Sequence, residues 1–384
     1  MNQIEKIVLV ANNIGGLGGV STFVRTMARE FTRRGYEVLL LGFDQVDAEV
    51  DLSEFTSFTA FDAPTPETVD PRTRVLGKAD PAVIASHRRL EKLRGRGRER
   101  LKRVLPEFDA RTAVICTQVF GMERLLDAGF DPGNRNGPLT FGQHHSSFDA
   151  ARVGGYVRRM LEAYKDIDRF VALTEADARD FQLAGIPSVS TIANPLDMPE
   201  VNPDPKSRTV TTVARIHEVK RIDRMLFAWS QVCQSFPEWN LEIWGSGPDE
   251  ELVAQLIAEL GLGSSAFLMG PTSNVPGVLA HSALTVLSSD EEGLPLSIVE
   301  AARAGLPTVS VDCAPGIREL IDDGITGIVT PPRSVEGLAA GLRALMDDDH
   351  ARRTMGAAAQ QKARQWSPAA IGDRWEEEFE RALR

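Results

Sequence analysis

The chain contains 384 residues, carries a formal net charge of −11 and is 42% hydrophobic. This length is too great for one ordinary compact core and suits two domains, and the composition excludes a disordered or fibrous protein. The sequence pI near 5.2 argues against a protein whose whole surface binds nucleic acid. The three cysteines are widely separated and form no CxxC or Cys/His cluster, so neither a disulfide framework nor a zinc site is expected.

The beginning of the chain has the pattern of a strand rather than of a signal peptide. Charged Glu5 and Lys6 precede an apolar run of only four residues, 7–10. No uninterrupted apolar run approaches the roughly 20 residues that a membrane helix requires. We therefore expect a cytoplasmic protein, soluble or at most resting on the inner face of the membrane.

Short apolar runs alternate with helix-period segments along the chain, a pattern typical of parallel sheets covered by helices on both faces. The first half has five predicted strands, at residues 6–10, 37–42, 113–117, 139–143 and 170–174. The second half has six, at residues 209–214, 241–245, 266–269, 284–288, 308–311 and 327–329. Helices are predicted between them, for example at residues 21–34, 221–233, 249–259 and 296–304. The expected fold class is α/β, with two doubly wound Rossmann-like domains in tandem.

A polar segment with four prolines, residues 194–205, indicates a linker between the two domains. The first domain is placed at residues 1–197 and the second at residues 198–366. An insertion with few strand signals interrupts the first domain at about residues 61–106. Residues 367–384 follow the period of an amphipathic helix, which is expected to pack back onto the first domain.

The segment from Ser288 to Gly305 carries the strongest functional signal. A predicted strand ends in small polar residues, Gly293 follows, and Pro295 suits the first turn of a helix. The free backbone N–H groups of residues 293–296, among them Leu294 and Leu296, would then point at one place and form an anion site. Glu292 would stand at the mouth of this helix and Glu300 one turn inside it. Two carboxylates beside an anion site suit a ligand with phosphate and hydroxyl groups. The alternative is an ordinary surface loop followed by a helix with a solvated Glu.

A second segment combines two cations at the carboxyl end of a predicted strand. Arg215 follows the strand directly, and Lys220 comes five residues later, just before a helix. Ligands bind at this end of parallel sheets, where Arg offers a phosphate a bidentate fork and Lys a point charge. Solvated basic residues in a turn are the equally ordinary alternative.

A third segment is the glycine-rich loop of residues 11–23, which contains Gly18 and Gly19 between the first strand and the first helix. Glycines here let the backbone approach a ligand closely. The loop fails the G-x-G-x-x-G pattern of dinucleotide sites, because Ser21 stands at the third glycine position. Asp44, after the second strand, imitates the acid that holds ribose and keeps an NAD-dependent oxidoreductase as an alternative.

Together these segments resemble glycosyltransferase family 4, retaining enzymes of the GT-B fold, and the resemblance extends over nearly the whole chain. Glu292 and Glu300 match the E-x7-E motif of that family. Gly18 and Gly19 resemble its N-terminal Gly-Gly loop, and Arg215 with Lys220 resembles its phosphate-binding segment. Ala214, Arg221 and Pro195 stand where the family has glycines, but none of these changes removes a charge.

The resemblance implies a nucleotide-sugar donor in a cleft between the two domains. Arg215 and Lys220 would grip the diphosphate, together with the amides of residues 293–296 and the Gly18-Gly19 loop. Glu292 would hold sugar hydroxyls and Glu300 the ribose hydroxyls, with the base near Gly270. A UDP-sugar is the expected donor, and no cofactor or metal is expected.

His145 follows a first-domain strand, where the family places a histidine beside the transferred sugar. The resemblance favours His145 over His144, and a structural histidine is the alternative. No residue is an obvious nucleophile. The family implies retention by front-side displacement, in which cations and helix amides stabilise the leaving diphosphate.

Residues 86–103 contain seven Arg and two Lys against two Glu, on a chain of net negative charge. This segment suits an anionic acceptor, such as a polyol-phosphate polymer, or an anionic membrane surface. A solvated helix in an arginine-rich chain is the alternative, since charge runs are usually solvated.

The sequence therefore predicts a hexosyltransferase that moves a sugar from a nucleotide donor to a hydroxyl of a glycan, polyol-phosphate, lipid or small molecule. An epimerase or phosphorylase of the same fold would share the donor site but need no separate acceptor. A non-catalytic sensor of nucleotide sugars is a further alternative. No nucleic-acid partner is expected.

Overall fold

The computed structural model describes residues 4–16, 18–45, 50–66, 74–75, 78–79 and 81–383. The chain divides into two compact units. Unit 1 comprises Met1–Ile192 with Gly372–Arg384, and unit 2 comprises Ala193–Ile371. The last helix, α14 (Pro368–Leu383), begins in unit 2 and belongs to unit 1 from Gly372 onward.

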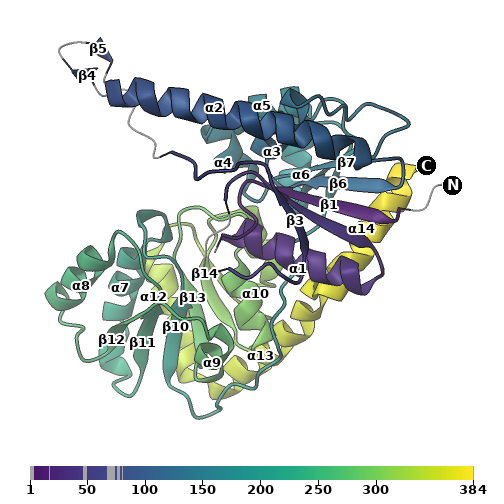
Figure 1. The fold of residues 1–384 in the computed structure, drawn as a ribbon. Coiled ribbons are helices and arrows are strands. Elements are labelled where there is room, and N and C mark those ends of the chain that lie inside the picture. Colours follow the sequence, from purple (N-terminus) through teal and green to yellow (C-terminus); the bar gives the residue numbers. More distant parts are fainter. Residues whose placement is uncertain are drawn as a thin grey trace. The chain divides into compact units, whose positions relative to one another are not determined.

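Unit 1 is built on a seven-stranded sheet with the order β3-β2-β1-β6-β7-β8-β9 (Figure 1). The strands are β1 (Lys6–Ala11), β2 (Glu37–Gly42), β3 (Thr56–Thr59), β6 (Thr112–Cys116), β7 (Leu139–Gln143), β8 (Arg169–Ala172) and β9 (Val189–Thr191). Every pair of neighbours is parallel. Because the carboxyl ends of parallel strands lie on the same side of the sheet, the loops after β1 and β7 lie on that side.

Helices cover both faces of this sheet, since alternate strand residues point to opposite sides. Val8 and Val10 of β1 pack in the cluster that includes side chains of α3 (Val119–Asp127), α5 (Tyr156–Ala163) and α6 (Glu175–Leu183). On the other face lie α1 (Gly19–Arg33) and α14, where Trp375 contacts Phe141 of β7 with ring centroids 5.7 Å apart. The short α4 (Phe148–Val153) follows β7.

The predicted insertion at residues 61–106 is mainly one long helix, α2 (Pro81–Val104), followed by the 3-10 turn η1 (Leu105–Glu107). Residues 67–73, 76–77 and 80 of that insertion lie outside the described residues. The strands β4 (Arg74–Val75) and β5 (Lys78–Ala79) form an antiparallel pair. In Figure 1, α2 runs along the α3 side of unit 1, and its N-terminal end reaches past the other helices toward β4 and β5.

Unit 2 is built on a six-stranded sheet with the order β12-β11-β10-β13-β14-β15, again parallel throughout (Figure 1). The strands are β10 (Thr209–Val213), β11 (Asn240–Trp244), β12 (Ala266–Gly270), β13 (Leu284–Leu287), β14 (Thr308–Val311) and β15 (Gly327–Thr330). The strand order runs outward in two directions from the centre of the sheet. From β10 the chain continues to β11 and β12 on one side, and from β13 it continues to β14 and β15 on the other. In open α/β sheets this switch point is where ligands bind.

One face of the second sheet packs against α7 (Ile222–Ser230), α8 (Glu250–Glu259) and α12 (Val335–Asp347) in a single apolar cluster. The other face carries α9 (Val275–Ala280), α10 (Leu296–Arg303) and α13 (Asp349–Ala363). The remaining elements are α11 (Pro315–Leu320) and the 3-10 turns η2 (Glu218–Lys220), η3 (Cys233–Ser235) and η4 (Arg364–Trp366).

The prediction of two doubly wound α/β units is confirmed. Each of the eleven predicted strands is present, with ends within two residues of those expected. The prediction missed β3 and β9, which are short and at the two edges of the first sheet. None of the helices in the described ranges is both long and apolar enough to cross a membrane.

Candidate active site

The E-x7-E segment lies at the carboxyl end of β13 and leads into α10. The helix starts at Leu296, as predicted, and Pro295 is its N-cap residue rather than part of its first turn. The loop is held close to α11, because a Cβ atom on Gly316 would lie only 2.3 Å from the carbonyl oxygen of Gly293. A residue without a side chain at position 316 is therefore required for this loop conformation.

Glu292 and Lys220 form an ion pair across the switch point of the second sheet. Lys220 Nζ lies 2.6 Å from Glu292 Oε1, and the same oxygen accepts a hydrogen bond of 2.7 Å from Ser289 Oγ. The Glu292 side chain is only 9% exposed. Sequence reasoning assigned Lys220 and Glu292 to different parts of a ligand, whereas the structure pairs them directly with each other.

Five of the predicted residues line one cavity of about 210 Å³, namely Arg215, Lys220, Glu292, Leu296 and Glu300. Arg215 is exposed and makes no hydrogen bond or ion pair with any residue that the structure describes. Its guanidinium is therefore available to an anion, while Lys220 is already neutralised by Glu292.

Glu300 lies on α10, at the base of the same cavity. Burial raises the pKa of its carboxyl above the usual value, because the charged form loses hydration. No hydrogen bond to its carboxylate from the described part of the chain offsets that loss. A buried carboxylate without a partner is suited to accept hydrogen bonds from hydroxyl groups of a ligand.

The backbone N–H groups at the start of α10 differ slightly from those expected. Pro295 carries no N–H group. The amides of Gly293, Leu294, Leu296 and Ser297 form no backbone hydrogen bond within the described ranges, and they precede or begin the helix. These four donors lie at the positive end of the α10 dipole, an arrangement that can hold an anion.

Two further glycines explain how the Arg215 loop is supported. A Cβ atom on Gly245 would lie 1.9 Å from the Ala214 carbonyl oxygen, and one on Gly247 would lie 2.0 Å from that of Ile216. The Gly-x-Gly turn after β11 therefore lets the backbone around Arg215 pack directly on it. Gly270, at the end of β12, has a φ of 77° with open space beside it.

Gly18, Gly19 and His145 belong to unit 1. Gly18 precedes α1, Gly19 is its first residue, and both are exposed with open space around them. The preceding loop is fixed by Arg25, which donates hydrogen bonds to the carbonyl oxygens of Ile14 and Gly16.

His145 follows β7 and is held from two sides. Its Nε2 lies 3.0 Å from Gln143 Oε1, and its ring meets Phe23 of α1 edge-on at 4.7 Å. His144 packs instead between the rings of Tyr156 and Phe181. Burial lowers the pKa of His144 to about 4, so this imidazole is neutral at pH 7.

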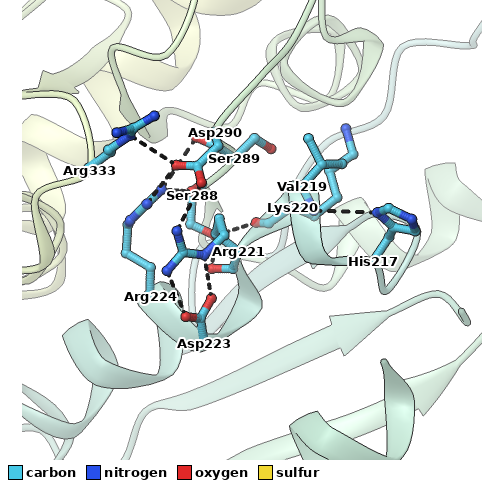
Figure 2. Close-up of polar contacts among 10 residues, drawn as sticks. All are labelled: His217, Val219, Lys220, Arg221, Asp223, Arg224, Ser288, Ser289, Asp290 and Arg333. Carbon is cyan, nitrogen blue, oxygen red and sulfur yellow. Dashed lines mark hydrogen bonds and ion pairs between the residues drawn. The ribbon is translucent and has the colours of Figure 1, made fainter. Parts of the chain in front are cut away.

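Sequence reasoning missed the polar residues that connect the two site loops. Ser288, Ser289, Asp290 and Arg224 hold the end of β13 against the turn that carries Lys220 (Figure 2). Ser288 to Asp290 stand just before the E-x7-E motif, but they carry no motif signal of their own. Arg224 lies on the buried side of α7, where an apolar residue is the ordinary expectation.

Two family matches cover most of the chain. Residues 194–362 match the family described as glycosyl transferases group 1, and residues 17–199 match the family described as glycosyltransferase family 4. The chain belongs to the glycosyltransferases of the GT-B fold.

Three curated relatives of this glycosyltransferase are 25% to 32% identical to it over the aligned residues. An uncharacterized glycosyltransferase of Haemophilus influenzae is 25% identical and covers 90% of this chain and 91% of its own length. A poly(glycerol-phosphate) alpha-glucosyltransferase of Bacillus subtilis is 27% identical over 64% of this chain and 37% of its own length. An exopolysaccharide phosphotransferase of Streptomyces coelicolor is 32% identical over 59% of this chain. The glycosyltransferase spans only 24% of that last protein.

The fold of the glycosyltransferase is also similar to solved structures. A mutant of TarM from S. aureus, in complex with fondaparinux, alpha-GlcNAc-glycerol and UDP, superimposes with a TM-score of 0.80. The similarity covers 97% of this chain and 99% of that chain at 15% sequence identity. At this identity the likeness supports the GT-B fold alone.

The alternative of an NAD-dependent oxidoreductase rested on Asp44 and the glycine loop. In the glycosyltransferase, the Asp44 carboxylate accepts a hydrogen bond from Thr65 Oγ1. The described residues contain no group of three or more His, Cys, Asp or Glu side chains that would hold a metal ion.

Proposed function

We propose that this glycosyltransferase moves a hexose-type sugar from a UDP-sugar to an acceptor hydroxyl with retention of the anomeric configuration. The observation that carries the proposal is the cavity at the switch point of unit 2. There a free guanidinium, a Lys–Glu ion pair and a buried carboxylate lie beside four unpaired amides. TarM, whose fold is similar, was solved in complex with UDP and alpha-GlcNAc-glycerol.

Each residue would then have a separate part in the reaction. Arg215 and Lys220 bind the donor diphosphate, and the amides of Gly293, Leu294 and Leu296 add hydrogen bonds to its oxygens. Glu292 binds hydroxyls of the transferred sugar, and Glu300 binds the ribose hydroxyls. Negative charge grows on the diphosphate as the glycosidic bond breaks, and these fixed donors stabilise it in the transition state.

The base and the sugar would be held by the remaining predicted residues. Gly270 and its neighbours offer backbone groups to the base, and Gly18 and Gly19 contribute amides of a flexible backbone to the phosphates. His145 would bind the transferred sugar, with its ring direction set by Gln143. Retention without an enzyme nucleophile requires that a donor phosphate oxygen assist deprotonation of the acceptor hydroxyl on the same face.

A thermal-shift panel tests the donor. The chain is heated with UDP, GDP, ADP, TDP or NAD, each without and with magnesium. A ligand at a hundred times its Kd adds about 2.7 kcal/mol to the stability of the folded state, which is a measurable shift. A shift with UDP that is indifferent to magnesium supports the proposal, whereas a shift with NAD alone contradicts it. Donor turnover without acceptor would instead favour the epimerase or phosphorylase.

The basic helix α2 supports an anionic acceptor for the same reaction. Arg88, Arg89, Lys92 and Arg94 are exposed and form no ion pair with described residues. Arg96 is paired with Asp62 at 2.8 Å, and Arg98 lies 3.8 Å from Asp127. We therefore place the contact with a polyol-phosphate polymer at residues 88–94 of the basic segment 86–103. The Bacillus subtilis relative is named for a poly(glycerol-phosphate) acceptor.

The acceptor contact is tested with the triple variant R88Q/R89Q/K92Q. Its KM for poly(glycerol-phosphate) should rise about tenfold at low salt, because several phosphate contacts are lost, while the KM for free glycerol stays the same. The matched control is R135Q/R158Q/R179Q, which removes three exposed arginines elsewhere in unit 1. Equal KM values in the two variants would contradict the contact. Binding of the wild type to phosphatidylglycerol vesicles, lost only in the α2 variant, would point to a membrane surface instead.

A further inference from the structure

Asp290 stands two residues before Glu292 and is surrounded by three arginines (Figure 2). Arg224 Nη2 lies 2.6 Å from Asp290 Oδ1, and Arg221 Nη1 lies 2.9 Å from Asp290 Oδ2. Arg333, itself largely exposed, approaches Oδ1 to 3.5 Å. Burial would raise the pKa of Asp290, but the hydrogen bonds from Arg224 and Arg221 outweigh it and hold that pKa below the usual value.

Arg224 is the buried centre of this network, with a side chain only 4% exposed. Besides Asp290, its guanidinium donates to the carbonyl oxygen of Ser288 at 2.5 Å. The N–H donors of a buried guanidinium need hydrogen-bond acceptors. If the backbone at the end of β13 moved away, a buried donor would be left unpaired and the folded state would lose stability. Arg224 is on the first turn of α7, and so this contact ties the β13 loop to the helix that follows the Lys220 turn.

Further bonds join the same two loops. Ser288 Oγ lies 2.9 Å from the carbonyl oxygens of both Lys220 and Arg221, and the Asp290 amide donates to the Val219 carbonyl at 2.8 Å. Arg221 has a left-handed backbone, with φ 49° and ψ 49°, and its guanidinium forms two hydrogen bonds with Asp223. The turn that ends in Lys220 is thus fixed on one side by the loop that carries Glu292.

Neither Arg224 nor Asp290 lines the cavity with Lys220 and Glu292. Asp290 lines a separate cavity of about 990 Å³, between α7 and α8, and Ile222 lines both. The two residues are therefore out of contact with a ligand in the smaller cavity.

We propose that Arg224 and Asp290 are positioning residues for catalysis, which hold Lys220 and Glu292 at the separation that the donor requires. This inference rests on the proposed function. A misplacement of about 1 Å in a catalytic group can lower a rate about a hundredfold. A change in Arg224 should therefore lower kcat through Glu292 rather than through the overall stability of unit 2.

The chain offers a close control for the substitution. Arg352 of α13 is also 4% exposed, donates to the carbonyl oxygen of Leu345 and pairs with Asp349. R224M and R352M both remove a buried guanidinium that bonds backbone carbonyl oxygen and one Asp, but only Arg224 contacts the site loops. We expect kcat for UDP release from UDP-glucose or UDP-N-acetylglucosamine, with glycerol as acceptor, to fall about 10- to 100-fold in R224M. It should change no more than about twofold in R352M, measured at a temperature where both variants are folded.

A milder pair of variants covers the case in which R224M does not fold. D290N keeps an oxygen acceptor but removes the charge that pairs with Arg224, and D349N makes the same change beside Arg352. D290N should lower kcat at least about fivefold, because a charge-assisted hydrogen bond becomes a neutral one, while D349N leaves kcat unchanged.

A double-variant cycle then identifies the route of the effect. If Arg224 acts by positioning Glu292, R224M should lower kcat by less than about twofold in an E292Q background, since the group being positioned is already disabled. Full additivity of R224M and E292Q, or equal losses in R224M and R352M, would overturn the inference while leaving the proposed function intact. Absence of UDP release by the wild type from any donor would overturn the proposed function, and the inference with it.

Discussion

At the scale of single residues, the two carboxylates of the E-x7-E segment have opposite electrostatic situations. Glu292 is neutralised by Lys220 and accepts a hydrogen bond from Ser289. Glu300 is buried without a charged partner among the described residues, and its pKa is raised. The charge of Glu292 is therefore compensated by groups of the protein itself. The charge of Glu300 destabilises the folded state until hydroxyl groups of a ligand donate hydrogen bonds to it.

The buried carboxylate gives a prediction about pH. A folded-state pKa above the unfolded value of about 4.5 means that the stabilising effect of the bound proton is complete below pH 4.5 and is lost as the pH rises through the folded pKa. E300Q should match the wild type in free energy of unfolding at pH 4 and exceed it at pH 8. Urea titrations without ligand measure this difference. UDP affinity at pH 8 should fall about tenfold, because a charged acceptor is lost. An E300Q protein that is less stable than the wild type at pH 8 would contradict the burial argument.

His144 gives a prediction of the opposite sign. Its folded-state pKa of about 4 is below the usual 6.5, so the unfolded chain binds a proton that the folded chain does not. Stability should therefore fall as the pH drops from 6.5 to about 4, by on the order of 3 kcal/mol from this group. H144Q should show a shallower loss over this range in urea titrations at successive pH values. The same slope in wild type and H144Q would show that other groups cause the acid sensitivity.

At the scale of elements, the site is shaped by the contact of backbones more than by side chains. Gly316 on α11 lets the Gly293 carbonyl approach, and Gly245 and Gly247 do the same for the backbone around Arg215. These glycines place loop segments against helices and turns at distances that a Cβ atom would forbid. The positions of Glu292 and Arg215 thus depend on neighbouring elements that carry no catalytic group.

Gly316 allows a direct test of this dependence. G316A would place a Cβ atom 2.3 Å from the Gly293 carbonyl oxygen, so the loop must shift. We expect about 1–3 kcal/mol of destabilisation and a loss of turnover of about tenfold or more. Thermal unfolding and donor turnover measure the two effects. The control is G263A in the same unit, where an added Cβ meets no atom within 4 Å. Normal turnover in G316A would show that the loop tolerates the displacement.

At the scale of the whole molecule, the two units have separate apolar cores. One cluster contains only residues of unit 1, among them Val8 and Phe181, and another contains only residues of unit 2, among them Trp229 and Ile243. The charged residues proposed for the diphosphate and the ribose all belong to unit 2, whereas Gly18, Gly19 and His145 belong to unit 1. The stability of each unit can therefore be perturbed separately.

Calorimetry should separate the units. Trp375 of α14 is fully buried against Phe141 and Phe379 in unit 1, so W375A should cost about 3–5 kcal/mol and lower the transition of that unit. UDP should raise the transition of unit 2 and leave the W375A-sensitive one nearly unchanged. A single transition that responds to both changes would show that the two units unfold as one.

The sequence determined the architecture to a large extent, because hydrophobic period and motif spacing are local properties. Eleven strands, the two doubly wound units and the segments that carry Glu292, Glu300, Lys220 and Arg215 all follow from patterns within a few residues. The edge strands β3 and β9 were missed because short strands at a sheet edge have little apolar signal.

The tertiary structure alone decided how these segments meet. Lys220 and Glu292 are 72 positions apart, and nothing in either segment indicates that the two side chains pair. Arg224 looks like an interruption of an apolar helix face until the carbonyl of Ser288 and the carboxylate of Asp290 are beside it. The requirement for glycine at position 316 likewise arises only from its contact with the Gly293 carbonyl. The physical reason is that ion pairs, buried hydrogen bonds and backbone contacts depend on distance in space, which the order of residues does not contain.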